Sequence, residues 1–508
     1  MAVVSPLRHF GAGDSDMRID GWPYDRPEYT SLFAAVQGET SRWNVPGVAV
    51  GVLRDGEIET VAAGFGNIFT RMPLTEDAIL QIGSISKVYT ATLAMILVDE
   101  GLLDLDEPVV TYLPDLTLAD EDAQRTVTLR HLLSHTSGIE GDRFLDYGMG
   151  EDSLEKAIAE FDTLRQWFVP GDLWSYSNAG FYLACRVIEK VSGKPFDTVF
   201  REKLIDPLGV KTAFFRAQDV ITYPHAVGHY LKSREEGHSL AHGYSFPRHI
   251  NGTGAVVTST RELLRFGQLH LGEGEIDGKR LLSSKLALEM REPIAEAGDF
   301  YRNYGIGWCV HEYPEFRTIS HGGATMGFRA NLMVVPDKDF AIAILTNGDA
   351  GSRAIQEIEA WALKHYLEFE RPTPSRVKRT GKQLAELAGT YTRHDGESTV
   401  AVVDDRLELK VAHINEENGE VEGEDTYPLI AVGELRYRIP DGPAKNAIVD
   451  FIEYTGNGRK QLYIRMGGRL SERAADDAKS AKAPAGKSAA KGKSKAPAGK
   501  SAPRGKKK

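Results

Sequence analysis

Two serines and a lysine stand where the chain passes into an apolar segment. Residues 82–90 read IGSISKVYT, and the chain continues as ATLAMILVDEG. A serine hydroxyl is a poor nucleophile near neutral pH unless a neighbouring base takes its proton. Residues three apart on a helix share a face, so Lys87 can reach Ser84, whereas Ser86 is adjacent to the lysine in sequence and points elsewhere. The spacing predicts Ser84 as a nucleophile that Lys87 activates.

The start of a helix adds a second argument for Ser84. Its free backbone N–H groups and the positive end of its dipole favour an oxygen that becomes negative during a reaction. A four-residue pattern of common residue types also arises by chance, and Ser84 could be an ordinary N-cap. Other segments must decide between these alternatives.

Two further segments carry groups suited to acyl transfer. Residues 176–178, Tyr-Ser-Asn, precede an amphipathic segment, and a tyrosine could share a proton with Lys87 and hand it to a leaving group. The simpler alternative is an aromatic side chain packed under a loop. Residues 319–328, ISHGGATMGF, form a predicted strand that becomes glycine-rich after His321. Those glycines let the backbone approach a ligand closely, although a β-bulge or a sheet edge would also explain them.

In this order, SISK, YSN and HGG resemble the motifs of the serine β-lactamase and penicillin-binding protein superfamily. The resemblance is to its class C-like members, which include esterases and D-aminopeptidases. The supporting segments are LRHLLSHTSGI (129–139), PGDLWSYSNAG (170–180), DPLGV (206–210), YGIGW (304–308) and MVVPDKDFAIAILTNG (333–348). The resemblance covers roughly residues 25–370. It implies a serine hydrolase that cleaves small esters, amides or peptides through an acyl-enzyme on Ser84.

The same resemblance implies a role for each matching residue. The implied catalytic residues are Ser84, Lys87 and Tyr176, with the tyrosine as general acid and base toward the leaving group and the hydrolytic water. The implied oxyanion hole consists of the backbone N–H groups of Ser84 and Ala324. The implied substrate-binding residues are Asn178, His321, Gly322 and Gly323. Which of Lys87 and Tyr176 is the formal base stays open, because two strongly coupled groups titrate as a pair.

The third motif departs from the β-lactamase pattern. It begins with His321 instead of a lysine, and Gly322 has no hydroxyl to hold a substrate carboxylate. A histidine in this position is expected to be neutral near pH 7. We therefore expect inefficient hydrolysis of β-lactams. A His-x-Gly motif is similar to that of D-aminopeptidases, and a glycine-rich motif also occurs among the esterases.

The strand signals lie at both ends of this region. Residues 46–66 alternate around Asp55-Gly56 and predict a hairpin. Residues 317–348 predict further strands, and residues 353–367 have helical spacing. Between them the chain is mostly helical to about residue 270, and the clearest predicted helices are 84–101, 153–168 and 179–192. This order predicts an α+β fold, in which an antiparallel sheet is flanked by terminal helices and joined to an all-helical subdomain.

The chain changes character after this region. We predict an N-terminal extension (1–24), a hydrolase domain (25–370), a linker (371–386), a β-domain (387–470) and a disordered Lys/Ala/Pro-rich tail (471–508). Alternating runs such as LELKV and LRYRI predict a small barrel or sandwich for the β-domain. It resembles the lipocalin-like appendages of some peptidases in architecture only, and it could be a passive cap.

Charge and composition limit the partners. The net charge is −11, but residues 479–508 hold eleven basic and no acidic residues, so the first 478 residues carry 50 basic and 72 acidic ones, a net charge of −22. An acidic body is a poor nucleic-acid surface, whereas the tail could contact polyanions weakly. We see no signal peptide and no membrane span, and we expect a cytoplasmic protein. Neither of the two cysteines has a CxxC partner, and we expect no metal or organic cofactor.

A different class of function remains open from the sequence. The fold could serve as a non-catalytic scaffold or binding protein whose basic tail carries the function. Three complete motif segments count against this alternative.

Overall fold

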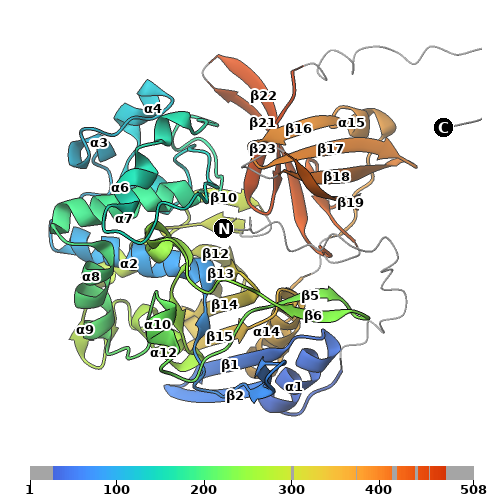
Figure 1. Cartoon of the computed structure of the whole chain (residues 1–508). Coiled ribbons are helices and arrows are strands. Elements are labelled where there is room, and N and C mark those ends of the chain that lie inside the picture. Colours follow the sequence, from blue (N-terminus) through green and yellow to red (C-terminus); the bar gives the residue numbers. More distant parts are fainter. Residues whose placement is uncertain are drawn as a thin grey trace, which may run out of the picture.

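The computed structural model describes residues 27–298, 302–372, 375–414, 420–440, 444–456 and 458–475. Within them lie a large mixed α/β body and a closed β-barrel (Figure 1). The predicted α+β fold class is confirmed. The predicted N-terminal extension and most of the predicted tail lie outside the described residues.

One antiparallel sheet organises the larger body. Its strands, in sheet order, are β10 (Ala295–Gly298), β11 (Arg302–Tyr304), β12 (Cys309–Glu312), β13 (Arg317–Thr325), β14 (Phe328–Val335), β15 (Phe340–Thr346), β1 (Gly47–Arg54), β2 (Glu57–Asn67) and β3 (Met72–Pro73). The β1–β2 hairpin turns at Asp55 (φ 51°) and Gly56 (φ 78°), the two positive values that a type I′ turn requires. Strands from both ends of the region therefore meet, because β1 pairs with β15.

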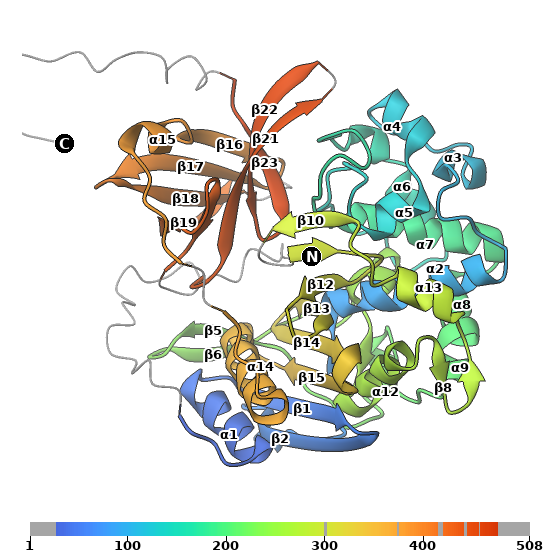
Figure 2. The same ribbon diagram turned by 180° about the vertical axis from the view of Figure 1, so that it is seen from behind.

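The two faces of this sheet bury different side chains. Along β15, Ile342 and Ile344 pack with the terminal helices α1 (Leu32–Arg42) and α14 (Gly351–Leu367), which cover one face (Figure 2). The alternating Ala341, Ala343 and Leu345 belong to the core shared with α2 (Ser86–Asp99) and α12 (Thr260–Leu271). A strand that is apolar on both faces thus holds two helical layers together.

Besides α2 and α12, the α-helices between β4 and β10 form the predicted subdomain. They are α3 (Val109–Tyr112), α4 (Glu121–Thr126), α5 (Leu129–Leu133), α6 (Ser153–Ile158), α7 (Asn178–Ser192), α8 (Phe196–Phe200), α9 (Asp206–Leu208), α10 (Ala217–Val220), α11 (Asn251–Gly254) and α13 (Ser284–Glu289). Short strand pairs interrupt them: β4 (Leu80–Gln81) with β7 (Val257–Thr258), β5 (His229–Ser233) with β6 (Gly237–Leu240), and β8 (Glu275–Ile276) with β9 (Lys279–Arg280).

The helix predicted over 153–168 is wrong in its second half. The α-helix α6 ends at Ile158, and only a short 3₁₀ turn follows before the chain becomes irregular. Trp167 and Phe168 are buried against Tyr463 and Leu470 of the barrel. These two apolar side chains belong to the interface between the larger body and the barrel and not to a helix face. The spacing of apolar residues therefore predicted a helix where none forms.

Eight strands close the barrel. They are β16 (Gly389–Arg393), β17 (Gly396–Val403), β18 (Arg406–Ile414), β19 (Val421–Ala431), β20 (Arg436–Arg438), β21 (Ile448–Gly456), β22 (Arg459–Met466) and β23 (Arg469–Arg473). Each strand pairs with the next, and β23 pairs back with β16. The segment predicted as a linker also carries a short helix, α15 (Gly381–Ala385), capped by Thr380.

The barrel is joined to the larger body by specific hydrogen bonds. The Tyr463 hydroxyl donates to the Trp167 carbonyl oxygen (2.6 Å), and the Tyr454 hydroxyl donates to Asp172 (2.8 Å). In Figure 1 the barrel lies beside the end of the sheet that carries β10. None of the helices in the described part of the chain is both long and apolar enough to cross a bilayer.

Truncation of the sheet core tests this architecture. Ile344 of β15 is fully buried where the sheet packs against the terminal helices. Ile344→Ala is expected to lower the free energy of unfolding by about 2–5 kcal/mol, because it removes buried methyl groups and leaves a cavity. Urea titration measures the change. Ile221→Ala, at a side chain 65% exposed, serves as control and should stay within about 0.5 kcal/mol.

Candidate active site

Ser84 lies in a 3₁₀ turn (Gly83–Ile85) that leads directly into α2. The turn is placed by Ile82, whose N–H donates to the Val256 carbonyl oxygen (3.0 Å). Gly83 has a φ of +53°, in the left-handed region that glycine tolerates best. Ser84 remains partly exposed while its neighbours in the turn are buried, so its hydroxyl lies at the surface of an otherwise closed core.

Lys87 is fully buried next to this hydroxyl. Its Nζ lies 3.2 Å from Ser84 Oγ and 2.8 Å from the carbonyl oxygen of Thr253 on α11. Burial lowers the pKa of Lys87 well below its usual range, and the charge of Arg469 lowers it further. Among the described residues no carboxylate forms an ion pair with it. The site therefore favours a neutral lysine amine beside the serine.

Ser86 has a structural function in the same turn. Its hydroxyl is buried, donates to the Gly83 carbonyl oxygen (2.7 Å) and accepts from the Val256 N–H (3.1 Å). The two serines are thus separated as their spacing predicts. Only Ser84 directs its hydroxyl toward Lys87.

Tyr176 approaches from the loop before α7. Its ring centroid lies 4.9 Å from Lys87 Nζ and 4.1 Å from the ring centroid of His135. Burial raises the pKa of its hydroxyl, while Arg469 and the nearby Ser84 hydroxyl act in the opposite direction. No described residue meets the geometry of a hydrogen bond to this hydroxyl. The tyrosine is therefore protonated near neutral pH and has a proton to donate.

The third predicted segment, on β13, lies against the serine turn. A side chain added at Gly323 would lie 1.9 Å from the Ile82 carbonyl oxygen and 3.2 Å from the Ser84 nitrogen. One added at Gly83 would lie 2.6 Å from the Ala324 nitrogen. The backbone N–H groups of Ser84 and Ala324 therefore come from two segments in direct contact, which only glycine permits.

His321 is buried and neutral. Its Nε2 lies 3.1 Å from the Tyr304 hydroxyl and its Nδ1 lies 2.6 Å from the Gly322 carbonyl oxygen. Burial lowers the pKa of His321 to about 3. The position that a lysine occupies in the β-lactamase motif thus carries no positive charge near neutral pH.

Asn178 is the first residue of α7 and is held by an acidic residue that the motifs did not reveal. Its Nδ2 donates to Asp142 Oδ1 (2.5 Å). Asp142 is buried and also pairs with Arg469 of the barrel, whose Nε lies 2.9 Å from Asp142 Oδ2. Sequence reasoning missed both residues, because neither lies in a motif and the two meet only when the barrel docks.

His131 and His135 both form hydrogen bonds with backbone N–H groups. His131 completes a capping box at the start of α5, and His135 Nδ1 accepts from the Ser177 N–H (3.0 Å). Among the described residues no cluster of three or more potential ligands could hold a metal ion.

Comparisons with known proteins agree with this geometry. The Beta-lactamase family model matches residues 34–365, and the chain belongs to that family. It is 32% identical over 382 residues to penicillin-binding protein 4 of Amycolatopsis lactamdurans, which covers 74% of this chain and 99% of the relative. The predicted resemblance to β-lactamases and penicillin-binding proteins is confirmed. The fold is that of a serine hydrolase of this family.

Two solved structures extend the comparison. The structure of SurE with D-Leu has a TM-score of 0.69 and 26% sequence identity, and covers 87% of this chain and 98% of its own. A D-stereospecific amidohydrolase from Streptomyces sp. has a TM-score of 0.53 and 25% identity, and covers 65% of this chain and 98% of its own. The first match extends beyond the residues that the family model covers.

The contact between β13 and the serine turn can be tested by adding one methyl group. Gly323→Ala places a Cβ 1.9 Å from a backbone oxygen. It should lower the free energy of unfolding by about 3 kcal/mol or more, since a rigid strand and turn must separate. Gly322→Ala is the matched control, because its Cβ would meet nothing closer than 3.8 Å. Thermal unfolding of both variants is the measurement, and equal losses would contradict the close approach.

Proposed function

We propose that this protein transfers acyl groups to water through an ester on Ser84. Ser84 Oγ attacks the carbonyl carbon of an amide or ester as Lys87 takes its proton. The leaving amine or alcohol departs with a proton from Tyr176. Water then attacks the acyl-enzyme as the Tyr176 phenolate takes its proton, and Lys87 returns its proton to Ser84 Oγ as the acid leaves. The single observation that carries this proposal is the 3.2 Å contact between Ser84 Oγ and a fully buried lysine amine.

The directions of the pKa shifts support a division of labour. A base must be unprotonated at the operating pH and an acid must hold its proton. The lowered pKa of Lys87 suits the base that accepts from Ser84. The raised pKa of Tyr176 suits the donor to the leaving group. We therefore assign Lys87 as the base in acylation.

The contact of β13 with the serine turn supports the proposed oxyanion hole. A negative oxygen needs preorganised donors from fixed positions. The N–H groups of Ser84 and Ala324 would supply them from two backbones that the glycines bring into contact. Gly323 allows this contact, and Gly322, where an added Cβ would meet nothing closer than 3.8 Å, would leave room beside the donors for a substrate.

Asn178 would bind the acyl side of the substrate through its oxygen. Its Nδ2 is engaged by Asp142, so the group left for a substrate is Oδ1, which can accept from an amide N–H. His321, neutral and hydrogen-bonded to Tyr304, would line the site without anchoring a carboxylate.

As substrates we propose small amides, esters or peptides with a D-configured residue. SurE is described with D-Leu, and the Streptomyces sp. relative is described as a D-stereospecific amidohydrolase. The predicted weak contact of the tail with polyanions rests on residues outside the described part of the chain and stays a prediction.

Exchange of each serine tests the proposed nucleophile. Ser84→Ala should lower kcat/KM by about 10⁴-fold or more, as loss of a catalytic nucleophile does. Ser86→Ala should stay within about tenfold, a change of about 1.4 kcal/mol in the barrier. It should still lower the melting temperature, because the buried Val256 N–H loses its acceptor. Rates with p-nitrophenyl acetate and D-alanine p-nitroanilide measure this.

If wild type and Ser84→Ala were equally inert on both substrates, and a fluorophosphonate left Ser84 unmodified by mass spectrometry, the proposal would fail. The non-catalytic scaffold would then be favoured. Equal losses from the two serine variants would contradict the assignment of Ser84.

Substrate preference follows from the neutral third motif. D-alanine p-nitroanilide should be cleaved with a higher kcat/KM than its L-enantiomer and than a chromogenic cephalosporin. The preference over the cephalosporin is expected because His321 offers no cation for its carboxylate. The preference for the D-enantiomer is expected from the similarity to SurE, described with D-Leu, and to the D-stereospecific amidohydrolase. Steady-state rates on the three compounds check this. A cephalosporin turned over fastest would show that another group anchors the carboxylate.

A further inference from the structure

The turn between β22 and β23 reaches from the barrel into the candidate active site. The Gly468 carbonyl oxygen accepts from the Tyr176 N–H (2.9 Å), which ties the turn to the backbone of the proposed acid. Gly468 has a φ of +81°, and a side chain there would lie 3.0 Å from the Trp174 ring. The turn thus fits closely under the Trp174–Tyr176 segment and needs glycine to do so.

Arg469, the next residue, contacts the proposed acid Tyr176 directly. Its guanidinium carbon lies 4.5 Å from the centroid of the Tyr176 ring. Its Nε lies 2.9 Å from Asp142 Oδ2, and both side chains are largely buried, with exposed fractions of 15% and 2%. Asp142 in turn accepts from Asn178. One barrel arginine therefore contacts the proposed acid and, through a carboxylate, the proposed substrate-binding amide.

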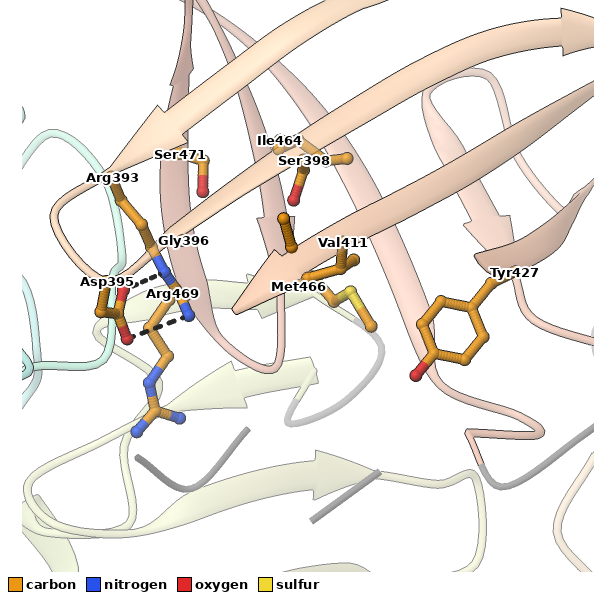
Figure 3. Close-up of a pocket in the computed structure, with 11 residues that line it drawn as sticks. Arg393, Asp395, Gly396, Ser398, Val411, Tyr427, Ile464, Met466, Arg469 and Ser471 are labelled. Carbon is orange, nitrogen blue, oxygen red and sulfur yellow. Dashed lines mark hydrogen bonds and ion pairs between the residues drawn. The ribbon is translucent and has the colours of Figure 1, made fainter. Parts of the chain in front are cut away.

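A second barrel turn holds the same segment of the larger body. His394, between β16 and β17, has its Nδ1 3.0 Å from Glu140 Oε1 and its Nε2 in contact with the Asp142 carbonyl oxygen. Figure 3 shows its neighbours Arg393 and Asp395, which form an ion pair at the edge of a barrel pocket. Arg469 lies on the same side of this pocket, and Tyr427 lies on the opposite side. Two barrel turns thus meet at residues 140–142.

The charge of Arg469 also acts on the proposed base. After burial, it is the largest contribution that lowers the pKa of Lys87, and the carboxylate of Asp142 opposes it. The arginine can therefore affect both the geometry and the protonation of the site. A passive cap would need neither a cation against the tyrosine ring nor a backbone acceptor for its N–H.

We propose that Arg469 is a positioning residue for acyl transfer, and that the β22–β23 turn of the barrel completes the active site. It holds the Tyr176 ring and, through Asp142, the side chain of Asn178. This inference rests on the proposed function of Ser84 and adds to it that the barrel is required for efficient turnover.

Arg469→Met in the full-length chain tests the proposal, because methionine keeps much of the side-chain length and removes the charge. We expect kcat/KM at pH 7 to fall by about 10²-fold, the size of loss that a small displacement of a catalytic group produces. The acid limb of the pH profile should move to higher pH, because loss of the cation raises the pKa of Lys87. Arg469→Lys should restore the position of the limb but only part of the rate, since lysine lacks the planar fork.

Two other ion pairs between the same bodies provide matched controls. Arg436 pairs with Glu296 (2.8 Å), and Arg165 pairs with Glu472 (3.3 Å). Glu296→Gln and Arg165→Gln break contacts between the barrel and the larger body without touching Tyr176. Their rates and pH profiles should match those of the wild type. A similar loss in these controls would assign the effect to docking in general and would overturn the specific role of Arg469.

Hydrogen–deuterium exchange of the 172–180 segment gives a readout that needs no turnover. Exchange of the Tyr176 amide should rise in Arg469→Met and stay at the wild-type level in both controls. An Arg469→Met variant with wild-type exchange and an unchanged pH profile overturns the inference. If the wild type hydrolyses nothing, the proposed function fails, and the exchange of this amide still decides whether the turn holds Tyr176.

Discussion

The burial of Lys87 is the constraint on which the rest of the site depends. An ammonium group removed from water without a carboxylate partner costs several kcal/mol, and a lysine in that position loses its proton instead. Here the amine has the Ser84 hydroxyl and the Thr253 carbonyl oxygen as its polar contacts, and aromatic rings lie beside it. The folding energy of the surrounding core therefore keeps the pKa of this amine well below that of a lysine in water.

The layers around this lysine explain how such a position is sustained. α2 is buried along nearly its whole length between the sheet and the helical subdomain, so Lys87 cannot turn toward solvent. β13 closes the same region from the sheet, where Gly323 allows its backbone to contact the serine turn. The same packing that excludes water also brings the backbone donors of two segments next to the serine hydroxyl.

The barrel adds a cation to a site that already disfavours cations. Arg469 lies against Tyr176, and its charge is balanced by Asp142. This ion pair places a carboxylate beside the guanidinium that lies near the lysine. Docking of the barrel therefore changes the electrostatics at Lys87, which a cover of apolar side chains would not do through a charge.

Much of this protein could be predicted from residue types and spacing. Some features depend only on the local sequence and can be predicted without knowledge of the fold. They are the distance of three residues between Ser84 and Lys87, the alternating pattern of the strands and the order of the motif segments. The α+β class, the β1–β2 hairpin and the all-β character of residues 387–470 follow from the same local patterns. The helix predicted over the end of 153–168 is wrong because Trp167 and Phe168 pack against the barrel. The spacing of apolar residues in the sequence does not indicate which distant segment will cover them.

Only the tertiary structure decided which distant residues share the site. Asp142 and Arg469 carry no motif, and they meet because two barrel turns dock on one loop of the larger body. The pKa shifts of Lys87 and Tyr176 were equally beyond the sequence, since burial is the first cause of each shift and burial is a property of packing. The sequence did predict a neutral His321, but not the burial that lowers its pKa. The sequence by itself determined which groups could perform the chemistry. The fold decided which are neutral and which are held by the barrel, because desolvation and contacts between distant segments exist only once the chain has packed.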